Sequence, residues 1–168
     1  RRLVLGDSAA GGRELSSAVA LVSAARAARA GQAPLSAKDL MREAGVARAH
    51  SHSPYSRFPV GAALVGASGK VYHGCNVENA SFGLTCCAER NAVFKAISEG
   101  EREFTAIAVT ARTGKGAPPC GACRQVMAEF SPEMWVYWRD TGGRILKKRL
   151  SALLPDMFEF KRPRAGKP

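Results

Sequence analysis

Three cysteines and one glutamate have the types and spacing of a catalytic zinc site. Cys120 and Cys123 form a Cys-x-x-Cys pair, a common half of a zinc site, and Cys87 precedes them in the chain. Three thiolates leave the fourth position of a tetrahedral ion open for water, as in catalytic sites. Glu89, two residues after Cys87, can carry protons beside that water. The pattern predicts one Zn²⁺ held by Cys87, Cys120 and Cys123, with Glu89 as the catalytic residue.

The order of these residues also indicates a reaction. A ligand Cys followed by x-Glu, and later by Pro-Cys-x-x-Cys, is the arrangement of zinc nucleobase deaminases, here at 87–89 and 119–123. Glu89 would take a proton from water at the metal, pass it to the ring nitrogen beside the amine-bearing carbon, and then protonate the leaving amine. We therefore expect hydrolytic deamination, with burial adjusting the pKa of Glu89 for both steps.

The three cysteines lie at or within the first turn of predicted helices, where free N–H groups and the helix dipole favour thiolates. Three thiolates on one dication leave a net negative site, so a nearby cation is needed to acidify water. Arg90 is placed to hydrogen-bond the sulfurs from outside the ligand set, and Arg124 is a second candidate. The alternative for Arg90 is a solvated helix residue.

A closed structural site with four cysteine ligands is the competing interpretation of the metal centre. Its fourth ligand would be Cys86 or Cys75. Cys86 and Cys87 would project about 100° apart on a helix, which makes sharing one ion awkward. We therefore prefer the open site.

The segments around these residues alternate between helix and strand patterns. Ser36 can cap the first helix, with Asp39 able to return a bond to the Ser36 amide. The patterns predict helices over 36–50, 87–99, 120–130 and 151–155, and strands over 60–65, 71–74, 105–110, 135–139 and 145–148. Helices interleaved with strands predict a three-layer α/β/α fold whose central mixed sheet has about five strands.

The chain of 168 residues is long enough for one compact domain, which we expect over 34–160. Residues 1–33, rich in Ala and Arg and followed by Pro34, are expected to be a flexible N-terminal extension, and 161–168 a basic C-terminal tail. Five cysteines, three of them assigned to metal, predict reduced thiols in a cytoplasmic protein, since no apolar run suggests secretion or a membrane span.

The net charge of +11 invites a nucleic-acid partner, but most of it lies outside the predicted domain. Residues 1–33 contribute +3 and 161–168 contribute +4, which leaves +4 for 34–160. Charge runs in tails are usually solvated, and these tails lack the aromatic residues that stack on single strands, except Phe160 at the edge. We expect neither a nucleic acid nor a membrane as a partner.

Five motifs in unbroken order over about 35–160 resemble the small, homotetrameric type of cytidine deaminase, which ligates zinc with three Cys. They are Pro54-Tyr55-Ser56-Arg57-Phe58-Pro59-Val60-Gly61-Ala62-Ala63-Leu64, Gly74-Cys75-Asn76-Val77-Glu78-Asn79-Ala80-Ser81-Phe82, Cys87-Ala88-Glu89-Arg90, Pro119-Cys120-Gly121-Ala122-Cys123-Arg124-Gln125 and Leu153-Leu154-Pro155-Asp156-Met157-Phe158. The resemblance implies deamination of cytidine and 2′-deoxycytidine to the uridines in pyrimidine salvage, by a homo-oligomer that is a tetramer.

The resemblance also implies how the nucleoside is held. Asn76 and Glu78 would bind the ribose hydroxyl. Phe58 would stack on or flank the pyrimidine, and Ala88 would belong to the substrate site. Phe158 would close the pocket, either of its own subunit or of another. A carboxylate accepts a sugar hydroxyl but repels a phosphate, so Glu78 favours a nucleoside over a nucleotide. The alternatives are a plain turn for the polar pair and core packing for the two aromatic residues.

Three other functions compete with this interpretation. A blasticidin-type deaminase shares the Cys-x-Glu and Pro-Cys-x-x-Cys elements, an enzyme that edits cytosine in RNA or DNA would use the basic charge, and a zinc-ribbon module would have no activity. The full segment from Asn76 to Phe82, together with Phe158, favours the nucleoside enzyme.

Overall fold

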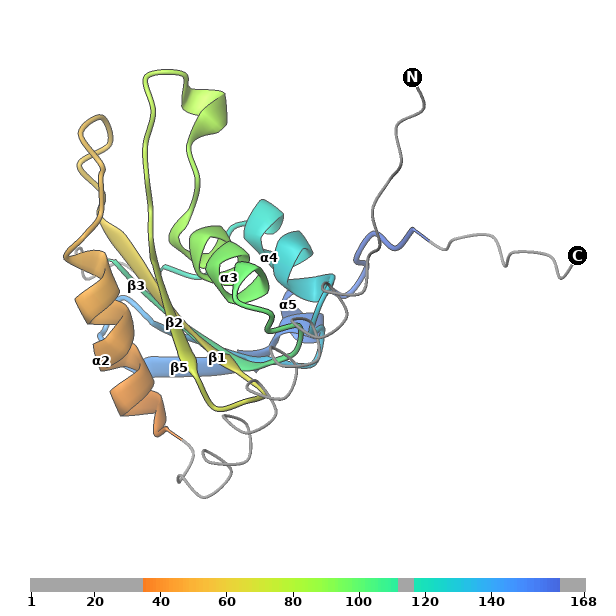
Figure 1. The fold of residues 1–168 in the computed structure, drawn as a ribbon. Coiled ribbons are helices and arrows are strands. Elements are labelled where there is room, and N and C mark those ends of the chain that lie inside the picture. The colour runs from red at the N-terminus through yellow and green to blue at the C-terminus, as the bar shows by residue number, and fades with distance from the viewer. Residues whose placement is uncertain (1–34, 112–116, 161–168) are drawn as a thin grey trace, which may run out of the picture.

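The structure of the protein is a computed structural model that describes residues 35–111 and 117–160. The predicted extension 1–33 and tail 161–168 lie outside the described residues, so the domain boundaries stay predictions. The described residues form a mixed five-stranded sheet with helices on both faces (Figure 1). The expected three-layer α/β/α fold is confirmed.

The sheet has the order β2-β1-β3-β4-β5, in which β3 and β4 pair in parallel and the other neighbours are antiparallel. Strands β1 to β5 span Val60–Gly66, Val71–Cys75, Phe104–Ala111, Trp135–Arg139 and Ile145–Arg149. The helices are α2 (Ala37–Arg48), α3 (Ala88–Ser98), α4 (Gly121–Ala128) and α5 (Leu150–Leu153), with a 3-10 turn η1 (Phe82–Leu84). All five predicted strands are present, with ends moved by one residue at most.

The predicted helices differ more at their ends. Cys87 and Cys120 are N-caps of α3 and α4 and not their first residues. Helix α5 starts one residue earlier than predicted and ends before Leu154 and Pro155, because a residue before proline is disfavoured in helix. Ser36 caps α2 by accepting from Asp39 N at 3.1 Å, but the Asp39 carboxylate accepts from the Ser36 hydroxyl at 2.6 Å, where a bond from the amide was expected.

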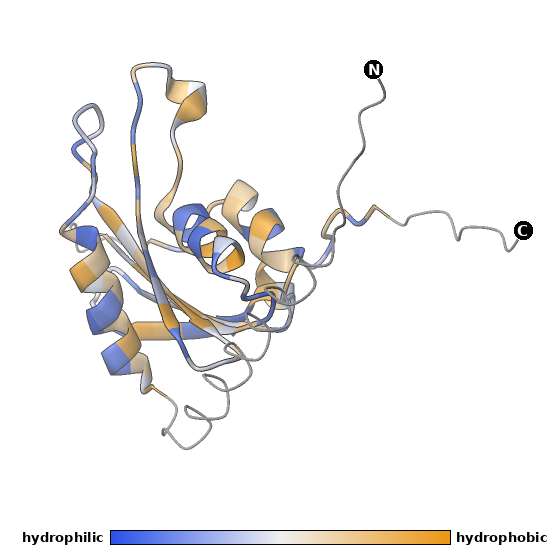
Figure 2. Cartoon of the chain, viewed as in Figure 1, coloured by the Kyte–Doolittle hydropathy of each residue, from blue (hydrophilic) through white to orange (hydrophobic). Residues whose placement is uncertain are grey.

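Helix α2 covers one face of the sheet, α3, α4 and α5 lie on the other, and each contributes buried residues to the core on its side. Figure 2 shows hydrophilic and hydrophobic residues side by side along α2 and α3. Two glycines permit the close approach of helices from opposite sides. A Cβ on Gly61 of β1 would overlap Ala44 O of α2, and a Cβ on Gly74 of β2 would overlap Ala88 O of α3. A side chain at Gly74 would therefore push away the helix start that follows Cys87.

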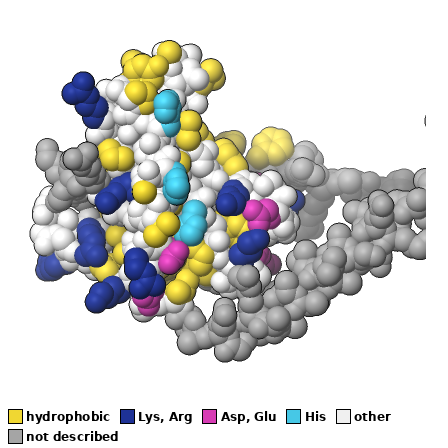
Figure 3. All heavy atoms as spheres, turned by 60° about the vertical axis from the view of Figure 1, so that its left-hand side comes forward, with side chains coloured by type: hydrophobic (Ala, Val, Ile, Leu, Met, Phe, Trp, Pro, Cys, Tyr) yellow, Lys and Arg dark blue, Asp and Glu magenta, His cyan; other side chains and the backbone are white. Residues whose placement is uncertain are grey.

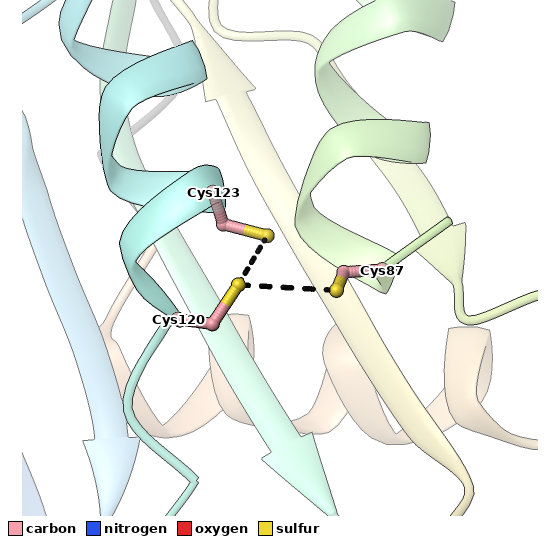
Figure 4. Close-up of side chains that lie close together, drawn as sticks. All are labelled: Cys87, Cys120 and Cys123. Carbon is pink, nitrogen blue, oxygen red and sulfur yellow. Dashed lines mark hydrogen bonds between the residues drawn. The ribbon is translucent and has the colours of Figure 1, made fainter. Parts of the chain in front are cut away.

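The topology explains why distant cysteines meet. Strands β2 and β3 are both antiparallel to β1, so they run in the same direction. Helix α3 follows β2 and α4 follows β3, and right-handed crossovers place both helices on the same face. Both helices therefore begin near the edge of the sheet where these strands end, and their N-termini lie close together (Figure 4).

Candidate active site

Three cysteine sulfurs converge between the starts of α3 and α4 (Figure 4). The Sγ atoms of Cys87 and Cys120 lie 4.0 Å apart, those of Cys120 and Cys123 lie 3.5 Å apart, and all three are within 4.8 Å of one another. Tetrahedral zinc with bonds of about 2.3 Å separates its sulfur ligands by about 3.8 Å. The spacing of the three sulfurs therefore fits a zinc site.

Helix positions give these sulfurs their direction and their charge. Cys87 and Cys120 have the extended backbone of N-cap residues, with ψ of 156° and 167°, and Cys123 lies in the first turn of α4. Hydrogen bonds from the Cys123 thiol and Arg90 lower the pKa of Cys87 far below its usual value, while the contact with Cys87 raises the pKa of Cys123. The charge of the pair therefore rests first on Cys87.

The other two cysteines lie outside this cluster. The Cys75 thiol donates to His50 O at 3.2 Å, and the backbone of Cys86 forms an antiparallel bridge with Val77. Burial raises the pKa of the Cys86 thiol. Within the described ranges, the cluster able to hold a metal contains Cys87, Cys120 and Cys123 and no fourth protein ligand. The closed four-cysteine site is not formed.

Glu89 is a buried carboxylate at the second position of α3, with 4% of its surface exposed. Burial raises the pKa of Glu89 to about 7, and the charge of Cys87 acts in the same direction. Its backbone N–H, the Cys123 thiol and Arg90 oppose the shift without cancelling it. Beside the cysteine cluster, this carboxylate can accept and release a proton near neutral pH.

Arg90 lies against the cluster as a cation that is not a ligand. Its Nη2 donates to Thr85 O at 3.0 Å and to Cys87 Sγ at 3.8 Å, and its Nε is buried without a partner in the described part of the chain. Arg124, the second candidate for this role, donates instead to the carbonyls of Pro119 and Leu153, both at 2.8 Å. Its charge is directed to backbone.

Asn76 lies just after β2 and is nearly buried, with 8% exposed. Its Oδ1 accepts from Ser51 Oγ at 2.6 Å and Val60 N at 2.8 Å, and its Nδ2 donates to Phe58 O at 3.0 Å. Asn76 therefore fixes the loop 51–60, which precedes β1.

Glu78 holds the turn in the same loop. Its carboxylate accepts from Tyr55 N at 2.9 Å, from Ser56 N at 3.2 Å and from the Ser56 hydroxyl. These bonds, the Ser56 hydroxyl first, lower the pKa of Glu78. The Ser56 hydroxyl also accepts from Phe58 N at 3.1 Å. Sequence reasoning missed Ser56 as the link between Glu78 and Phe58, although a serine in a turn often bonds backbone two residues on.

The remaining predicted substrate residues differ in burial. Ala88 is fully buried between Cys87 and Glu89, whereas Phe58 is 37% and Phe158 73% exposed. The backbone of Phe158 is bonded to the side chain of Gln125, a contact that the sequence did not reveal.

Because most of the net positive charge lies outside the predicted domain, the domain 34–160 itself has a net charge of only +4. Lysines and arginines are scattered over the face in Figure 3, with acidic side chains among them. On β5, Lys147 and Arg149 pack over the ring of Trp135, at 3.7 and 3.8 Å from its centroid.

Within the described ranges, no helix has the length and apolar character needed to cross a membrane.

Comparison with known proteins identifies the arrangement. Residues 35–139 match the family model described as the cytidine and deoxycytidylate deaminase zinc-binding region. The chain belongs to this deaminase family. Zinc is the metal of this family, and the cofactor prediction is confirmed at that level.

Individual members of the deaminase family match over nearly their whole length. A cytidine deaminase of Halalkalibacterium halodurans is 55% identical over 71% of this chain and 91% of its own, and one of Sporosarcina psychrophila is 50% identical over 71% and 88%. The crystal structure of cytidine deaminase from Burkholderia pseudomallei superposes with a TM-score of 0.70 at 48% identity, covering 74% of this chain and all of that one. The predicted family and fold are confirmed.

Proposed function

We propose that this protein catalyses the zinc-dependent hydrolytic deamination of cytidine and 2′-deoxycytidine, giving uridine or 2′-deoxyuridine and ammonia. One observation carries the proposal. A buried Glu89 with a pKa near neutrality stands beside three cysteine sulfurs spaced for zinc, in a chain that is up to 55% identical to cytidine deaminases.

Cys87, Cys120 and Cys123 would hold the zinc ion, which would act as a Lewis acid and lower the pKa of water. Glu89 takes one proton from the attacking water and donates it to the ring nitrogen next to the amine-bearing carbon. It then takes the remaining proton of the hydroxyl that has added to the carbon and delivers it to the amine, which leaves as ammonia as the carbonyl forms, so one carboxylate serves twice. Arg90 draws charge from the thiolates through its hydrogen bond to Cys87, which keeps the site from being too electron-rich to activate water.

The nucleoside would be held by the loop residues. Glu78 has about four acceptor positions, of which three are used by Tyr55 and Ser56, so one is left for a ribose hydroxyl. Asn76 would contribute to the same hydroxyl and hold Phe58 in place through the Phe58 carbonyl. The same carboxylate would repel a 5′-phosphate, which favours nucleosides over nucleotides.

The base would lie between Ala88 and the aromatic side chains. Phe58 flanks the pyrimidine in this proposal, and Phe158 closes the pocket. In the single chain Phe158 is 73% exposed, and Phe82 and Leu84 are each 71% exposed. Large exposed apolar side chains favour burial in a further subunit, and we propose a homotetramer.

The cellular role proposed for the enzyme is pyrimidine salvage in the cytoplasm. Neither a nucleic acid nor a membrane is a proposed partner. The catalytic domain is proposed to be 34–160, with 1–33 and 161–168 outside it.

The test is turnover of cytidine, followed by loss of ultraviolet absorbance, with zinc measured in the same sample. We expect deamination at about one zinc per chain. Blasticidin serves as the competing substrate, and Glu89→Gln is the matched inactive control. A zinc-loaded protein that does not deaminate cytidine would overturn the proposal.

A further inference from the structure

The segment that carries Phe158 is fixed by a side chain of the metal-binding helix. Phe158 N donates to Gln125 Oε1 at 3.1 Å, and Gln125 Nε2 donates to Phe158 O at 2.8 Å. One side-chain amide thus satisfies both backbone polar groups of a single residue, as a neighbouring strand would. The described residues after α5, drawn in blue in Figure 1, contain no helix or strand that could do this.

Gln125 is part of a two-residue attachment. Its neighbour Arg124 donates to Leu153 O at 2.8 Å, at the end of α5, and to Pro119 O, just before Cys120. Both residues directly follow Cys123 in α4. Helix α4, whose start carries Cys120 and Cys123, is therefore also hydrogen-bonded to the backbone of the segment that follows α5.

Packing alone does not decide where Phe158 lies. The apolar side chains of Leu153, Leu154 and Met157 are partly buried against the core and hold the preceding part of the segment. The Phe158 ring is 73% exposed and is not among the side chains packed against the core that the described residues form. Its position then depends on its backbone, and the backbone depends on Gln125.

We propose that Gln125 is a positioning residue for the reaction, which holds the backbone of Phe158 so that the ring is presented to the pyrimidine pocket. The inference rests on the proposed function, because the role of Phe158 in closing the substrate pocket belongs to that proposal. Gln125 acts through Phe158, so its contribution disappears when the ring is absent.

A double-mutant cycle tests this dependence. Gln125→Met keeps side-chain length and helix propensity but removes both hydrogen bonds. In the wild-type background we expect kcat/KM for cytidine to fall about tenfold, mainly through KM, with zinc content unchanged. In a Phe158→Ala background the same change should alter kcat/KM by less than about twofold. Equal losses in both backgrounds would overturn the inference.

Proteolysis supplies a readout that needs no activity. Chymotrypsin cleaves after aromatic residues, and cleavage at Phe158 of the zinc-loaded full chain should become faster in Gln125→Met. Phe82 is 71% exposed in the single chain and belongs, like Phe158, to the side chains assigned to a subunit contact, so it is a matched internal control whose cleavage rate should not change. Equal acceleration at both residues would mean general loosening and would overturn the inference. A wild-type protein that leaves cytidine unchanged would overturn the proposed function instead, and the proteolysis would still report whether Gln125 holds Phe158.

Discussion

The site joins two regions that are built in different ways. The cysteine centre, formed by Cys87, Glu89, Cys120 and Cys123, is placed on the first turns of two helices that pack on the sheet. The wall segments, which we define as 51–60, 76–86 and 154–160, lie almost entirely outside helices and strands. They are shaped by side chains that bond to backbone, chiefly Asn76, Glu78 and Gln125.

The difference separates chemistry from recognition. Residues on these helix starts are held by elements that pack in the core, so under the proposed function proton transfer and metal binding would use side chains carried on packed helices. The wall segments leave large apolar side chains exposed, including Phe158 and Phe82, so under the proposed function nucleoside recognition would depend on local hydrogen bonds and on the surface of a further subunit. Changes in the cysteine centre should therefore abolish activity, whereas changes in the wall segments should alter affinity.

The largest effect is expected from loss of a cysteine of the cluster. Cys123→Ala should lose zinc and reduce turnover below detection, because two thiolates cannot hold the ion in a tetrahedral site. Zinc per chain and cytidine turnover are the measurements.

Cys86→Ser is the matched control, since Cys86 adjoins a predicted ligand but lies outside the cluster. It should keep zinc and activity. Metal loss in Cys86→Ser alone would contradict the assignment of ligands.

Glu89→Gln should have the next largest effect and should separate chemistry from metal binding. The amide keeps the shape of the side chain but cannot carry a proton, so kcat should fall by about 10²–10⁴-fold or more, since both proton steps are lost. Zinc should stay at about one per chain. Near-normal kcat would contradict the mechanism.

A smaller effect should distinguish cytidine from its monophosphate. A 5′-phosphate brings about two negative charges close to Glu78 in a poorly screened pocket, so we expect kcat/KM about a hundredfold lower for the nucleotide, and almost no turnover of single-stranded RNA. Steady-state rates on the three substrates at one salt concentration measure this. Comparable efficiency on the nucleotide or on RNA would contradict the assignment of a nucleoside substrate.

Glu78→Gln sharpens that prediction by removing the charge. It should bring the two efficiencies within about tenfold of each other. Glu103→Gln is the control, because Glu103 is exposed and precedes β3, at the sheet edge away from the starts of α3 and α4. It should leave the ratio unchanged.

The contrast also explains what the sequence could predict. The clustering of the cysteines was predictable because Cys-x-Glu and Cys-x-x-Cys place the predicted ligands at fixed offsets at helix starts. The strands followed from apolar runs such as the one from Val60 to Val65. These patterns are local, so they can be recognised without knowledge of tertiary contacts.

The wall segments were less predictable because their bonds connect distant residues. Gln125 and Phe158 are 33 positions apart, and Ser56 and Glu78 are 22 apart. No periodicity links such pairs. Asn76 and Glu78 were identified through resemblance, which pointed to the sugar but not to their bonds with the loop 51–60.

The smallest effect is expected from deleting 1–33. Helix α2 begins with a cap formed by Ser36 and Asp39, and the core on its face of the sheet starts at Leu40. The matched family region begins at residue 35, and the solved Burkholderia pseudomallei chain is covered completely by 74% of this one. The shortened protein should therefore fold, bind about one zinc and deaminate cytidine within about twofold of the full chain, as measured by thermal unfolding and steady-state kinetics. Insoluble protein, or a large loss of kcat/KM, would show that the extension belongs to the domain or to its wall segments.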